Sequence, residues 1–597
     1  MGKIKAALSS LAVKAIKGSA YVRKDGLAAT YKRVKTQRSK DLPFAEIARK
    51  PLYSERELRA QRRSVFPRRP TISLLLFVQR ATEEQLRQTV RSLLAQSYGQ
   101  WELCLCTDGS RSFRCGDRRV RMVKGDGINA AFAASTGEYI AFLGEGDLLH
   151  PAALHDIVKA LCETEAELLY TDEVSFTNEI TDAAAPLLKP AYGPDSLLSR
   201  DFMGSLTVCA RSLFVRVGGF RDAFAGARLR DFHLRAADAA GSIAHVPELL
   251  YYRRAGLHSE DAEAGRQAVA DFLRSKGYEP TVETLPEDPL SCRISYALED
   301  RPLISLLIPN CEQQEALTRC IDSIYAKTSY PHFELVIVEN NSHSPELFRY
   351  YEELKKTHEN CRVAVWDKPF NYSAVNNFGA QLCRGEYILL LNNDTEVLSP
   401  HWLEEMLMFA QRADVGVVGA KLLYPDGRIQ HGGVLLGAWG LADHYFIGEE
   451  DGDGVMGRLR YVQDLSAVTG ACLLIRRSLY MHLGGMNEEL TICFNDVDLC
   501  LKAKKAGYQV VWTPFARLCH YESLSRASDE TVQKRGRLNK EIFTIRDRWG
   551  EVLREGDMSF NPNYKLKTPM AVASVLTPHP ARCVRKSGGL LPERSRI

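Results

Sequence analysis

Short apolar runs alternate with helical patterns along most of the chain, and this pattern occurs twice. The run ISLLLFV at Ile72 is followed by a helical stretch through Leu94 and by a second run, WELCLC. The run ISLLIP at Ile304 lies 232 residues later and is followed by the same order of helix and strand. Alternation of this kind predicts a mainly parallel sheet covered by helices. We therefore expect an α/β protein that contains two copies of one domain.

The pattern divides the chain into five segments. We expect the first copy at 71–293 and the second at 303–560, because the repeat is far longer than the ~20–50 residues of a solenoid unit. The polar, proline-punctuated stretch 283–302 predicts a linker. Its first part overlaps the end of the first copy, and residues 294–302 form its end between the two copies. Residues 1–70 are expected to form a basic arm, and residues 561–597 a basic tail with little fixed structure.

Polar residues follow three apolar runs of the second copy. In open parallel sheets, ligands bind at the carboxyl ends of the strands, so polar side chains at these points are candidates for binding. The run YILLL, for example, ends in Asn-Asn-Asp, whereas the matching run of the first copy ends in Gly-Glu-Gly-Asp. The candidates at the three strand ends are Pro309 and Asn310, Glu339 and Asn340, and Asn393 and Asp394.

Asp394 stands just beyond a five-residue apolar run, where an unpaired buried carboxylate would be costly. A divalent cation that bridges the carboxylate to a diphosphate would remove this cost, because Mg²⁺ and Mn²⁺ prefer oxygen ligands and substrate phosphates. The alternative is an aspartate that only opens the turn after the strand.

Two further candidates lie about a hundred residues later. Asp496 and Asp498 begin an amphipathic helix, NDVDLCLKAKKAG, so one acid can cap the helix while the other faces the strand ends as a general base. His520 follows a strand-like run, VVWTPFARLC, and is either a metal ligand or a surface histidine.

Taken together, these motifs resemble those of the family 2 glycosyltransferases with the GT-A fold, which build bacterial surface polysaccharides. The first and second strands of the family resemble LLIPN and VIVENNS, and the asparagine-rich segment beside the nucleotide resembles FNYSAVNNFGA, which contains Asn376 and Asn377. The metal-binding DxD strand end resembles LLLNNDTEV, the acceptor-side strand resembles TGACLLIRRS with Gly470, and the base motif resembles NDVDLCLKAKKAG.

The resemblance implies two tandem GT-A domains and inverting transfer of a sugar from a nucleoside diphosphate sugar, for which dTDP-rhamnose is a reasonable donor. The acceptor would be a growing polysaccharide or a lipid-linked oligosaccharide. Asp394 would hold Mg²⁺ or Mn²⁺, His520 would contact the metal or the diphosphate, and Asp496 would be the base. The strand-end residues with Asn376 and Asn377 would bind the nucleotide sugar, and Gly470 and Asp498 would lie on the acceptor side. The sequence departs from the family in keeping one acid of DxD and in having Glu339 where aspartate is commoner.

The first copy lacks the residues to which the resemblance assigns chemistry. Aligning the two Gly-Glu-Tyr-Ile strands places Gly146 opposite Asp394. Continuing the alignment, with one residue of slip, places Leu229 opposite Asp496 and Arg253 opposite His520. The first domain is therefore expected to be degenerate. Glu145 and Asp147 remain close by, so a shifted acid pair, and with it a bifunctional enzyme, stays an alternative.

Charge and composition add expectations about location. Residues 1–70 contain 19 Lys and Arg against 5 Asp and Glu, and apolar residues at helical spacing near Ile4 predict a basic amphipathic helix that lies on anionic lipid, through residues 1–40. A solvated basic arm is the alternative. Scattered cysteines and the lack of a spanning run or signal peptide indicate a cytoplasmic protein, peripheral at most on the inner face of the membrane, with no nucleic-acid partner.

One further interpretation remains beside the transferase. The chain could be a non-catalytic glycan-binding or assembly protein with two silent domains. The glycines of DGDGVMG, from Asp451, have dinucleotide-motif spacing but follow no strand, and we interpret them as a loop that covers bound donor beside Asp443 and His444.

Overall fold

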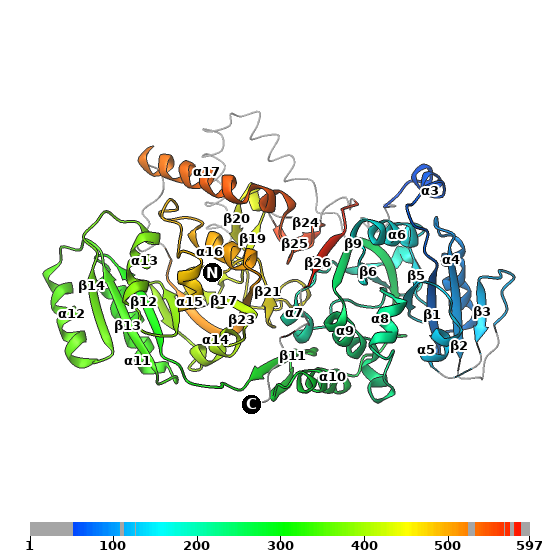
Figure 1. Cartoon of the computed structure of the whole chain (residues 1–597), viewed down its shortest axis with the longest axis horizontal. Coiled ribbons are helices and arrows are strands. Elements are labelled where there is room, and N and C mark those ends of the chain that lie inside the picture. The colour runs from blue at the N-terminus through cyan, green and yellow to red at the C-terminus, as the bar shows by residue number, and fades with distance from the viewer. Residues whose placement is uncertain are drawn as a thin grey trace, which may run out of the picture.

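Two large mixed sheets, each flanked by helices, form the two lobes of the molecule (Figure 1). The computed structural model describes residues 52–107, 113–123, 125, 127–522, 532–565, 568–572, 578–586 and 591. The amphipathic helix predicted near Ile4 lies outside the described residues. Within the described residues, no helix is both long and apolar enough to cross a membrane.

The first sheet has the strand order β26-β9-β6-β8-β4-β1-β2-β3, with β5 beside β9 and β7 beside β6. Its strands are β1 (Ile72–Val78), β2 (Trp101–Thr107), β3 (Val120–Val123), β4 (Tyr139–Leu143), β5 (Leu148–Leu149), β6 (Leu168–Phe176), β7 (Ala184–Leu187), β8 (Thr207–Ala210), β9 (Ser242–Arg254) and β26 (Arg582–Arg585). Its helices are α3 (Glu55–Gln61), α4 (Glu83–Leu94), α5 (Ile128–Ala134), α6 (Ala153–Thr164), α7 (Pro194–Ser199), α8 (Arg211–Arg216), α9 (Arg228–Ala239) and α10 (Ala262–Ser275).

The second sheet has the order β14-β13-β12-β15-β22-β17-β23-β16, with β18 beside β17 and β21 beside β23. Its strands are β12 (Ile304–Asn310), β13 (Phe333–Glu339), β14 (Cys361–Val365), β15 (Tyr387–Leu391), β16 (Thr395–Val397), β17 (Val415–Leu423), β18 (Ile429–His431), β21 (Gln463–Asp464), β22 (Cys472–Arg476) and β23 (Gln509–His520). Two short hairpins, β19 (Val434–Leu436) with β20 (Ala442–His444) and β24 (Tyr564–Lys565) with β25 (Thr568–Val572), lie apart from it. The helices are α11 (Gln314–Lys327), α12 (Pro345–Thr357), α13 (Tyr372–Leu382), α14 (Trp402–Ala410), α15 (Arg477–His482), α16 (Asn495–Lys505) and α17 (Val532–Glu555).

The two sheets share one topology, which confirms the α/β tandem predicted from the sequence. β1 pairs in parallel with β2 and β4, as β12 does with β13 and β15, and Ile72 faces Tyr139 as Ile304 faces Tyr387. The central strands are buried on both faces because helices cover each sheet on both sides, which explains their nearly continuous apolar runs. The strand ends of each copy therefore present comparable sites.

The stretch predicted as a linker is instead mostly a β-hairpin. β10 (Pro280–Leu285) pairs antiparallel with β11 (Asp288–Tyr296), and only the residues after Tyr296 form an extended connection to β12. Cys292, Ile294 and Tyr296 are buried, because the hairpin packs on α10 and α14. Its alternating apolar residues point inward, a pattern that its prolines obscured.

Buried polar contacts join the two domains. Arg412, which is 4% exposed, makes two hydrogen bonds to Asp195 of α7, at 2.5 and 3.0 Å. Beside this pair, the backbone N–H of Ser196 donates to the side chain of Asp464 at 2.9 Å, and the Asp464 N–H donates back to the Ser196 hydroxyl at 2.9 Å. A paired and hydrogen-bonded buried charge fixes geometry, so the domains meet in a specific orientation.

The segment after α17 returns to the first domain, although the sequence predicted little fixed structure after residue 560. Asn561 donates to Asp172 at 2.6 Å, and β26 pairs antiparallel with β9 at the edge of the first sheet (Figure 1, red). The domains are thus tied by buried contacts and by this returning segment.

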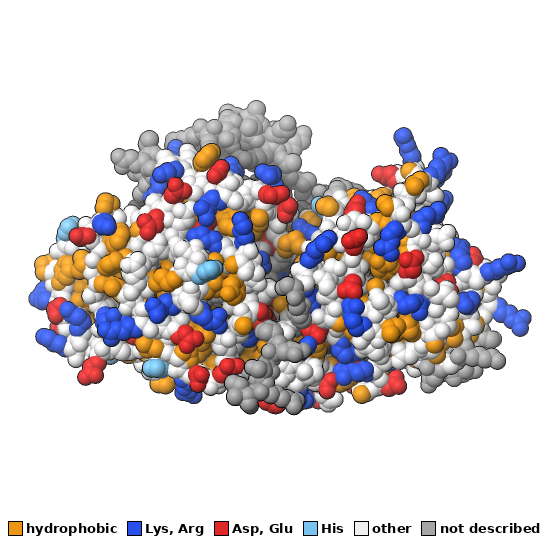
Figure 2. Space-filling view, viewed as in Figure 1, with side chains coloured by type: hydrophobic (Ala, Val, Ile, Leu, Met, Phe, Trp, Pro, Cys, Tyr) orange, Lys and Arg blue, Asp and Glu red, His pale blue; other side chains and the backbone are white. Residues whose placement is uncertain are grey.

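Lys, Arg, Asp and Glu side chains are interspersed over the visible face of both domains (Figure 2).

Candidate active site in the second domain

A chain of hydrogen bonds joins the ends of β12, β13 and β15. Tyr351 of α12 donates to Glu339 and accepts from the side-chain amide of Asn310 at 2.8 Å. Asn393 donates in turn to Asn310 Oδ1 at 2.5 Å. Burial and the hydrogen bond to Glu339 raise the pKa of Tyr351, so the phenol stays neutral. The three strand ends predicted as a site therefore meet, and they are held by a tyrosine that the sequence analysis did not single out.

Pro309 and Asn340 complete this end of the site. Pro309, the second-last residue of β12, is partly buried. Asn340 donates to the carbonyls of Trp366 and Lys368, both at 3.1 Å, while its Oδ1 is buried without a partner among the described residues. Asn340 thus offers one acceptor oxygen to a ligand.

Asn376 and Asn377 of α13 differ in what their contacts leave available. Asn377 Oδ1 accepts from Tyr480 at 2.7 Å and from the N–H of Met486 at 2.8 Å, and its amide donates to Met486 O at 2.9 Å. These bonds tie α13 to the chain before α16. Asn376 is fully buried, and its Oδ1 has no partner among the described residues. Asn377 therefore holds α13 in place, and its side-chain oxygen is already used by the protein.

Asp394 and His520 lie against each other, because Thr395 of β16 faces His520 of β23. His520 Nε2 is 3.2 Å from Asp394 Oδ1, but the two atoms are not in hydrogen-bonding geometry. Both side chains are buried, and Asp394 Oδ1 and His520 Nδ1 have no hydrogen-bond partner among the described residues. A buried carboxylate oxygen without a partner is costly unless a cation or donor occupies the site.

Asp496 lies at the start of α16, where Phe494 has a left-handed backbone (φ 62°) that turns the chain into the helix. Its Oδ2 accepts from the N–H of Gly470 at 2.9 Å, and its Oδ1 accepts from the N–H of Val497 at 2.8 Å. The carboxylate is partly exposed, and each oxygen keeps a further lone pair for a substrate proton. It is oriented by the backbone and remains accessible.

A continuous path of contacts connects Asp496 with Asp394. Tyr372 of α13 donates to Asn392 Oδ1 at 3.1 Å and lies 3.2 Å from the carbonyl of Gly470, the residue whose N–H holds Asp496. Asn392 Nδ2 then lies 3.4 Å from His520 Nε2. The predicted base and the predicted metal ligands are therefore parts of one polar network, which includes Tyr372 and Asn392.

Asp498, predicted on the acceptor side, is fully buried and faces α17. It accepts from Arg548 and from the Trp549 indole, each at 2.9 Å, and lies 3.1 Å from Lys502 one turn along its own helix. With these partners it cannot contact a sugar directly in this conformation. It fixes α16, and with it Asp496, against α17.

A pair of histidines borders the site, and the sequence analysis missed one of them. His431 of β18 is buried, with its Nδ1 3.2 Å from His444 Nδ1 and its Nε2 3.3 Å from the N–H of Thr469. Burial, His444 and His520 hold the pKa of His431 well below its usual range. Burial also lowers the pKa of His444, and the charge of Asp496 partly opposes this effect. Nothing in the pattern GRIQHGG marked His431, because it reaches the site only through the fold.

The residues present fit a divalent cation that also binds a substrate diphosphate. Asp394 offers a carboxylate oxygen that accepts no hydrogen bond and His520 an imidazole nitrogen, both acceptable ligands for Mn²⁺ and the first also for Mg²⁺. Among the described residues, no group of three or more His, Cys, Asp or Glu is placed to hold a metal by itself. Such a cation would therefore depend on oxygen ligands from the substrate.

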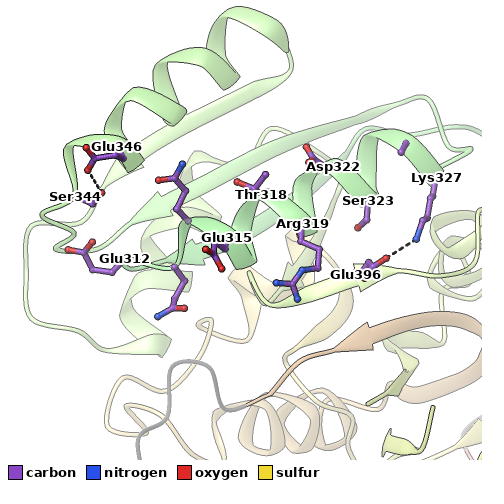
Figure 3. A pocket seen from close by; sticks show the side chains of 13 residues that line it. Glu312, Glu315, Thr318, Arg319, Asp322, Ser323, Lys327, Ser344, Glu346 and Glu396 are labelled. Carbon is purple, nitrogen blue, oxygen red and sulfur yellow. Dashed lines mark hydrogen bonds and ion pairs between the residues drawn. The ribbon is translucent and has the colours of Figure 1, made fainter. Parts of the chain in front are cut away.

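An open groove with a volume of about 1120 Å³ runs along α11 beside this site (Figure 3). Figure 3 shows Lys327 reaching across to Glu396, and the remaining charged residues on the groove are mainly acidic. Arg319 stacks over Tyr521 at 4.0 Å, and the N–H of Tyr521 donates to the carbonyl of Asp394 at 2.9 Å. The groove thus adjoins the Asp394 site through Tyr521. Residues 523–531, which follow, lie outside the described residues.

The strand registers give the same correspondence between copies as the sequence alignment. Leu148 faces Tyr252 in the first domain as Glu396 faces Cys519 in the second, which places Gly146 at the position of Asp394 and Arg253 at that of His520. Asp231 of α9 pairs with Arg235 one turn on, as Asp498 does with Lys502. Leu229 and Asp496 each lie two residues before these acids and are therefore equivalent.

The acids that remain in the first copy are used by the protein itself. Glu145 Oε2 accepts three backbone N–H groups, those of residues 79–81, at 2.6–2.8 Å. Asp147 is fully buried and accepts from Tyr251, the N–H of Arg254 and His258, at 2.5–2.8 Å. At a shifted metal site on these two residues, the alternative raised by the sequence, a cation would compete with these donors for the carboxylate oxygens.

Comparisons with known proteins agree with this duplicated architecture. The Glycosyl transferase family 2 model matches residues 76–182 and 305–484, so it matches both domains. The chain is 37% identical over 528 residues to an uncharacterized protein, y4gI, of Sinorhizobium fredii, covering 83% of this chain and 58% of that one. It is 36% identical over 490 residues to the O-antigen biosynthesis protein RfbC of Myxococcus xanthus, covering 77% of this chain and 38% of that one.

A shorter match involves an N-acetylglucosaminyl-diphospho-decaprenol L-rhamnosyltransferase of Mycobacterium tuberculosis, 37% identical over 62 residues, or 10% of this chain and 20% of that one. The chain thus spans less than two thirds of the length of these relatives. Both copies of the domain, which share one topology, match the model of glycosyltransferase family 2.

Proposed function

We propose that the second domain is an inverting glycosyltransferase that moves a sugar from a nucleoside diphosphate sugar to a glycan or a lipid-linked glycan. The observation that supports this most directly is the polar network that links an accessible carboxylate, Asp496, to a buried carboxylate, Asp394, one oxygen of which accepts no hydrogen bond. One acid is placed to accept a proton from the acceptor hydroxyl, and the other to attract a cation that would stabilise the leaving diphosphate.

The proposed reaction is a single displacement. The acceptor hydroxyl oxygen attacks the anomeric carbon from the face opposite the diphosphate, and the bond to the diphosphate oxygen breaks with its electron pair leaving on that oxygen. Asp496 takes the proton from the attacking hydroxyl, and the Gly470 N–H holds the carboxylate in place during the transfer. Attack from the opposite face inverts the anomeric configuration.

Asp394 and His520 would hold the divalent cation of this site, which would stabilise the negative charge that develops on the leaving diphosphate. Asn310, Glu339 and Asn393 would contact the nucleoside end, since they meet at the adjacent strand ends. Asp498 would position α16 rather than contact the acceptor.

The names of the relatives suggest where to look for substrates. One matched protein is named as an L-rhamnosyltransferase that acts on a diphospho-decaprenol-linked sugar, and another as an O-antigen biosynthesis protein. We therefore propose dTDP-rhamnose as the first donor to test and a lipid diphosphate-linked sugar as the first acceptor. The membrane contact predicted for residues 1–40 lies outside the described residues and stays a prediction.

Release of nucleoside diphosphate from a panel of sugar nucleotides, with a membrane-derived acceptor, tests the proposal. Asp496→Asn preserves the shape and the acceptor oxygen for the Gly470 N–H but removes the base, so we expect kcat to fall at least about 100-fold while the donor still binds. Asp426→Asn makes the same chemical change on an exposed turn and should leave kcat unchanged.

Full activity in Asp496→Asn would eliminate the proposed base. No turnover with any donor, together with retained glycan binding, would favour the non-catalytic assembly protein. EDTA should abolish turnover and Mg²⁺ or Mn²⁺ should restore it, and turnover that resists EDTA would contradict the role given to Asp394.

A further inference from the structure

A cavity of about 420 Å³ lies at the strand ends of the first domain, the place that the active site occupies in the second. Its volume falls within the ~300–1,000 Å³ typical of small-molecule sites. Leu229 and Arg253, the counterparts of Asp496 and His520, both line it. The first copy has therefore lost its catalytic groups and kept its pocket.

A metal cannot take its former place in this pocket. Gly146 has a φ of +75°, and a Cβ there would lie 2.6 Å from Leu257 Cδ1 and 3.2 Å from Arg254 Nε. The space in which Asp394 stands in the second domain is thus filled by other side chains in the first. Any ligand of this cavity must be bound without that carboxylate.

Positive charge remains in the cavity although Glu260 also lines it, because burial raises the pKa of Glu260 and favours its neutral form. Glu173 pairs with Lys189 at 3.0 Å, and Asp201 pairs with His233 at 2.8 Å. The side chain of Arg253 makes no hydrogen bond or ion pair with any described residue. Burial raises the pKa of Glu173, and the charges of Lys189 and Arg253 lower it. An unpaired guanidinium in a concave site is a ready ligand for phosphate or carboxylate oxygens.

A second arginine supports this reading. Arg230 is only 2% exposed, lines the cavity, and donates to the carbonyls of Leu198 and Leu290, at 3.1 and 2.8 Å. Its Nε is buried without a hydrogen-bond partner among the described residues. A buried donor without an acceptor is unfavourable, and a bound anion or hydroxyl would satisfy it.

The rest of the lining suits a sugar ring. Phe77, Phe142 and Phe220 contribute apolar and aromatic surface beside the charged groups. Aromatic and aliphatic faces pack against the C–H faces of a sugar, while charged and amide groups bind its hydroxyls. The mixture of aromatic floor and unpaired arginine therefore favours a saccharide that carries an anionic group.

The second domain contributes to the same cavity. Met456 lies in the loop that the sequence predicted as a cover for the donor of the second domain, yet it lines the cavity of the first. The neighbouring Gly457 approaches Asp288 of the hairpin, which itself pairs with Arg200. Lys421 and Arg517 hold the start of this loop through Asp451, each at 2.7 Å. A molecule bound in the cavity would thus contact both domains.

We propose that the first domain is a metal-independent binding site for a sugar diphosphate, closed by Met456 of the second domain. This rests on the proposed function, because its donor and the lipid diphosphate-linked acceptor proposed for it each carry a sugar joined to a diphosphate. Arg253 binds the diphosphate, the phenylalanines contact the sugar, and no bond is broken there. The first domain would hold one substrate of the reaction next to the domain that uses it.

Isothermal titration calorimetry of the full chain in EDTA tests the proposal, because EDTA removes binding that needs a metal. The probes are nucleoside diphosphate sugars in one arm and a short-chain lipid diphosphate sugar in the other, which separates the donor from the acceptor as the source. We expect one equivalent of one probe to bind in EDTA. Arg253→Met should weaken this binding at least about tenfold, and Arg91→Met, an exposed arginine on α4, should not change it.

Further variants locate the bound probe. Asp394→Ala should leave binding in EDTA unchanged, whereas Met456→Ala should weaken it about fivefold through lost apolar contact. Thermal unfolding of each variant shows whether it folds. Binding that persists in Arg253→Met, or that disappears in Asp394→Ala, would overturn the proposal, as would the absence of binding by both probes. Intact turnover with no binding in EDTA would refute this site alone, and binding without turnover would refute only the proposed reaction.

Discussion

The two domains share a sheet and differ in how their strand-end acids are satisfied. In the first, Glu145 and Asp147 accept all their hydrogen bonds from the protein. In the second, Asp394 keeps a buried oxygen without a hydrogen bond. An acid at a strand end is therefore not by itself a sign of chemistry. What distinguishes the two sites is whether the protein itself or a bound ligand must supply the partners of the carboxylate oxygens.

The largest expected effect comes from removing one acid from each copy. Asp394→Ala should lower kcat/KM at least about 100-fold, because the transition state loses several kcal/mol of stabilisation of the charge on the leaving diphosphate. The free energy of unfolding should change little. Asp147→Ala should instead cost about 2–4 kcal/mol of stability, because three donors lose a buried acceptor. Steady-state kinetics and urea unfolding of both variants measure this contrast. Loss of turnover in folded Asp147→Ala would show that the first domain takes part in catalysis.

Next in size are the buried acids that hold the equivalent helices. Asp498→Asn and Asp231→Asn each remove the negative partner of buried ion pairs, and each should destabilise the fold by about 3 kcal/mol. Only Asp498→Asn should also lower kcat, by about tenfold, because it loosens the helix that carries Asp496. Equal kcat in the two variants would remove the positioning role of Asp498.

A smaller effect tests whether the first copy can regain its metal ligand. Gly146 and Gly218 both have a φ of +75°, but a Cβ at Gly146 meets Leu257, whereas one at Gly218 meets nothing within 4 Å. Gly146→Ala should therefore cost about 1–3 kcal/mol more than Gly218→Ala, the difference being steric. Equal unfolding free energies would mean that the pocket has room for a carboxylate.

The smallest expected effect concerns pH. Burial and the neighbouring histidines hold the pKa of His431 well below its ordinary value of 6.5. Below pH 6.5 the unfolded chain therefore takes up a proton that folded His431 does not, and stability falls by up to about 1.4 kcal/mol per pH unit until the folded pKa is reached. His431→Gln should make the dependence of the thermal midpoint on pH shallower between pH 6.5 and 5. His401→Gln, at an exposed site, should not alter the slope.

Much of this arrangement could be predicted from the sequence because it depends on strand ends. Apolar runs fix the strands, and the residues that follow them must reach one edge of a parallel sheet, so Asn310, Glu339 and Asp394 could be grouped before the structure was known. The duplication supplied the register, which placed Gly146, Leu229 and Arg253 correctly.

The remaining features depend on contacts between distant segments. His431 and Tyr372 reach the site from a short strand and a helix whose sequences carry no special signal. The loop that carries Met456 crosses to the other domain, where local sequence gives no indication of its partner. Asp498 resembled a substrate contact because spacing alone does not reveal that Arg548 lies opposite it.

The pairing of β26 with β9 also has a consequence for the order in which the chain is made. More than three hundred residues separate the two strands, so β9 remains an open edge on the ribosome until the whole second domain has been synthesised. The domain translated first is thus the one completed last. A chain interrupted before Arg582 would expose that edge to aggregation even though every residue of the second sheet is present, which makes completion of translation a condition for a stable first domain.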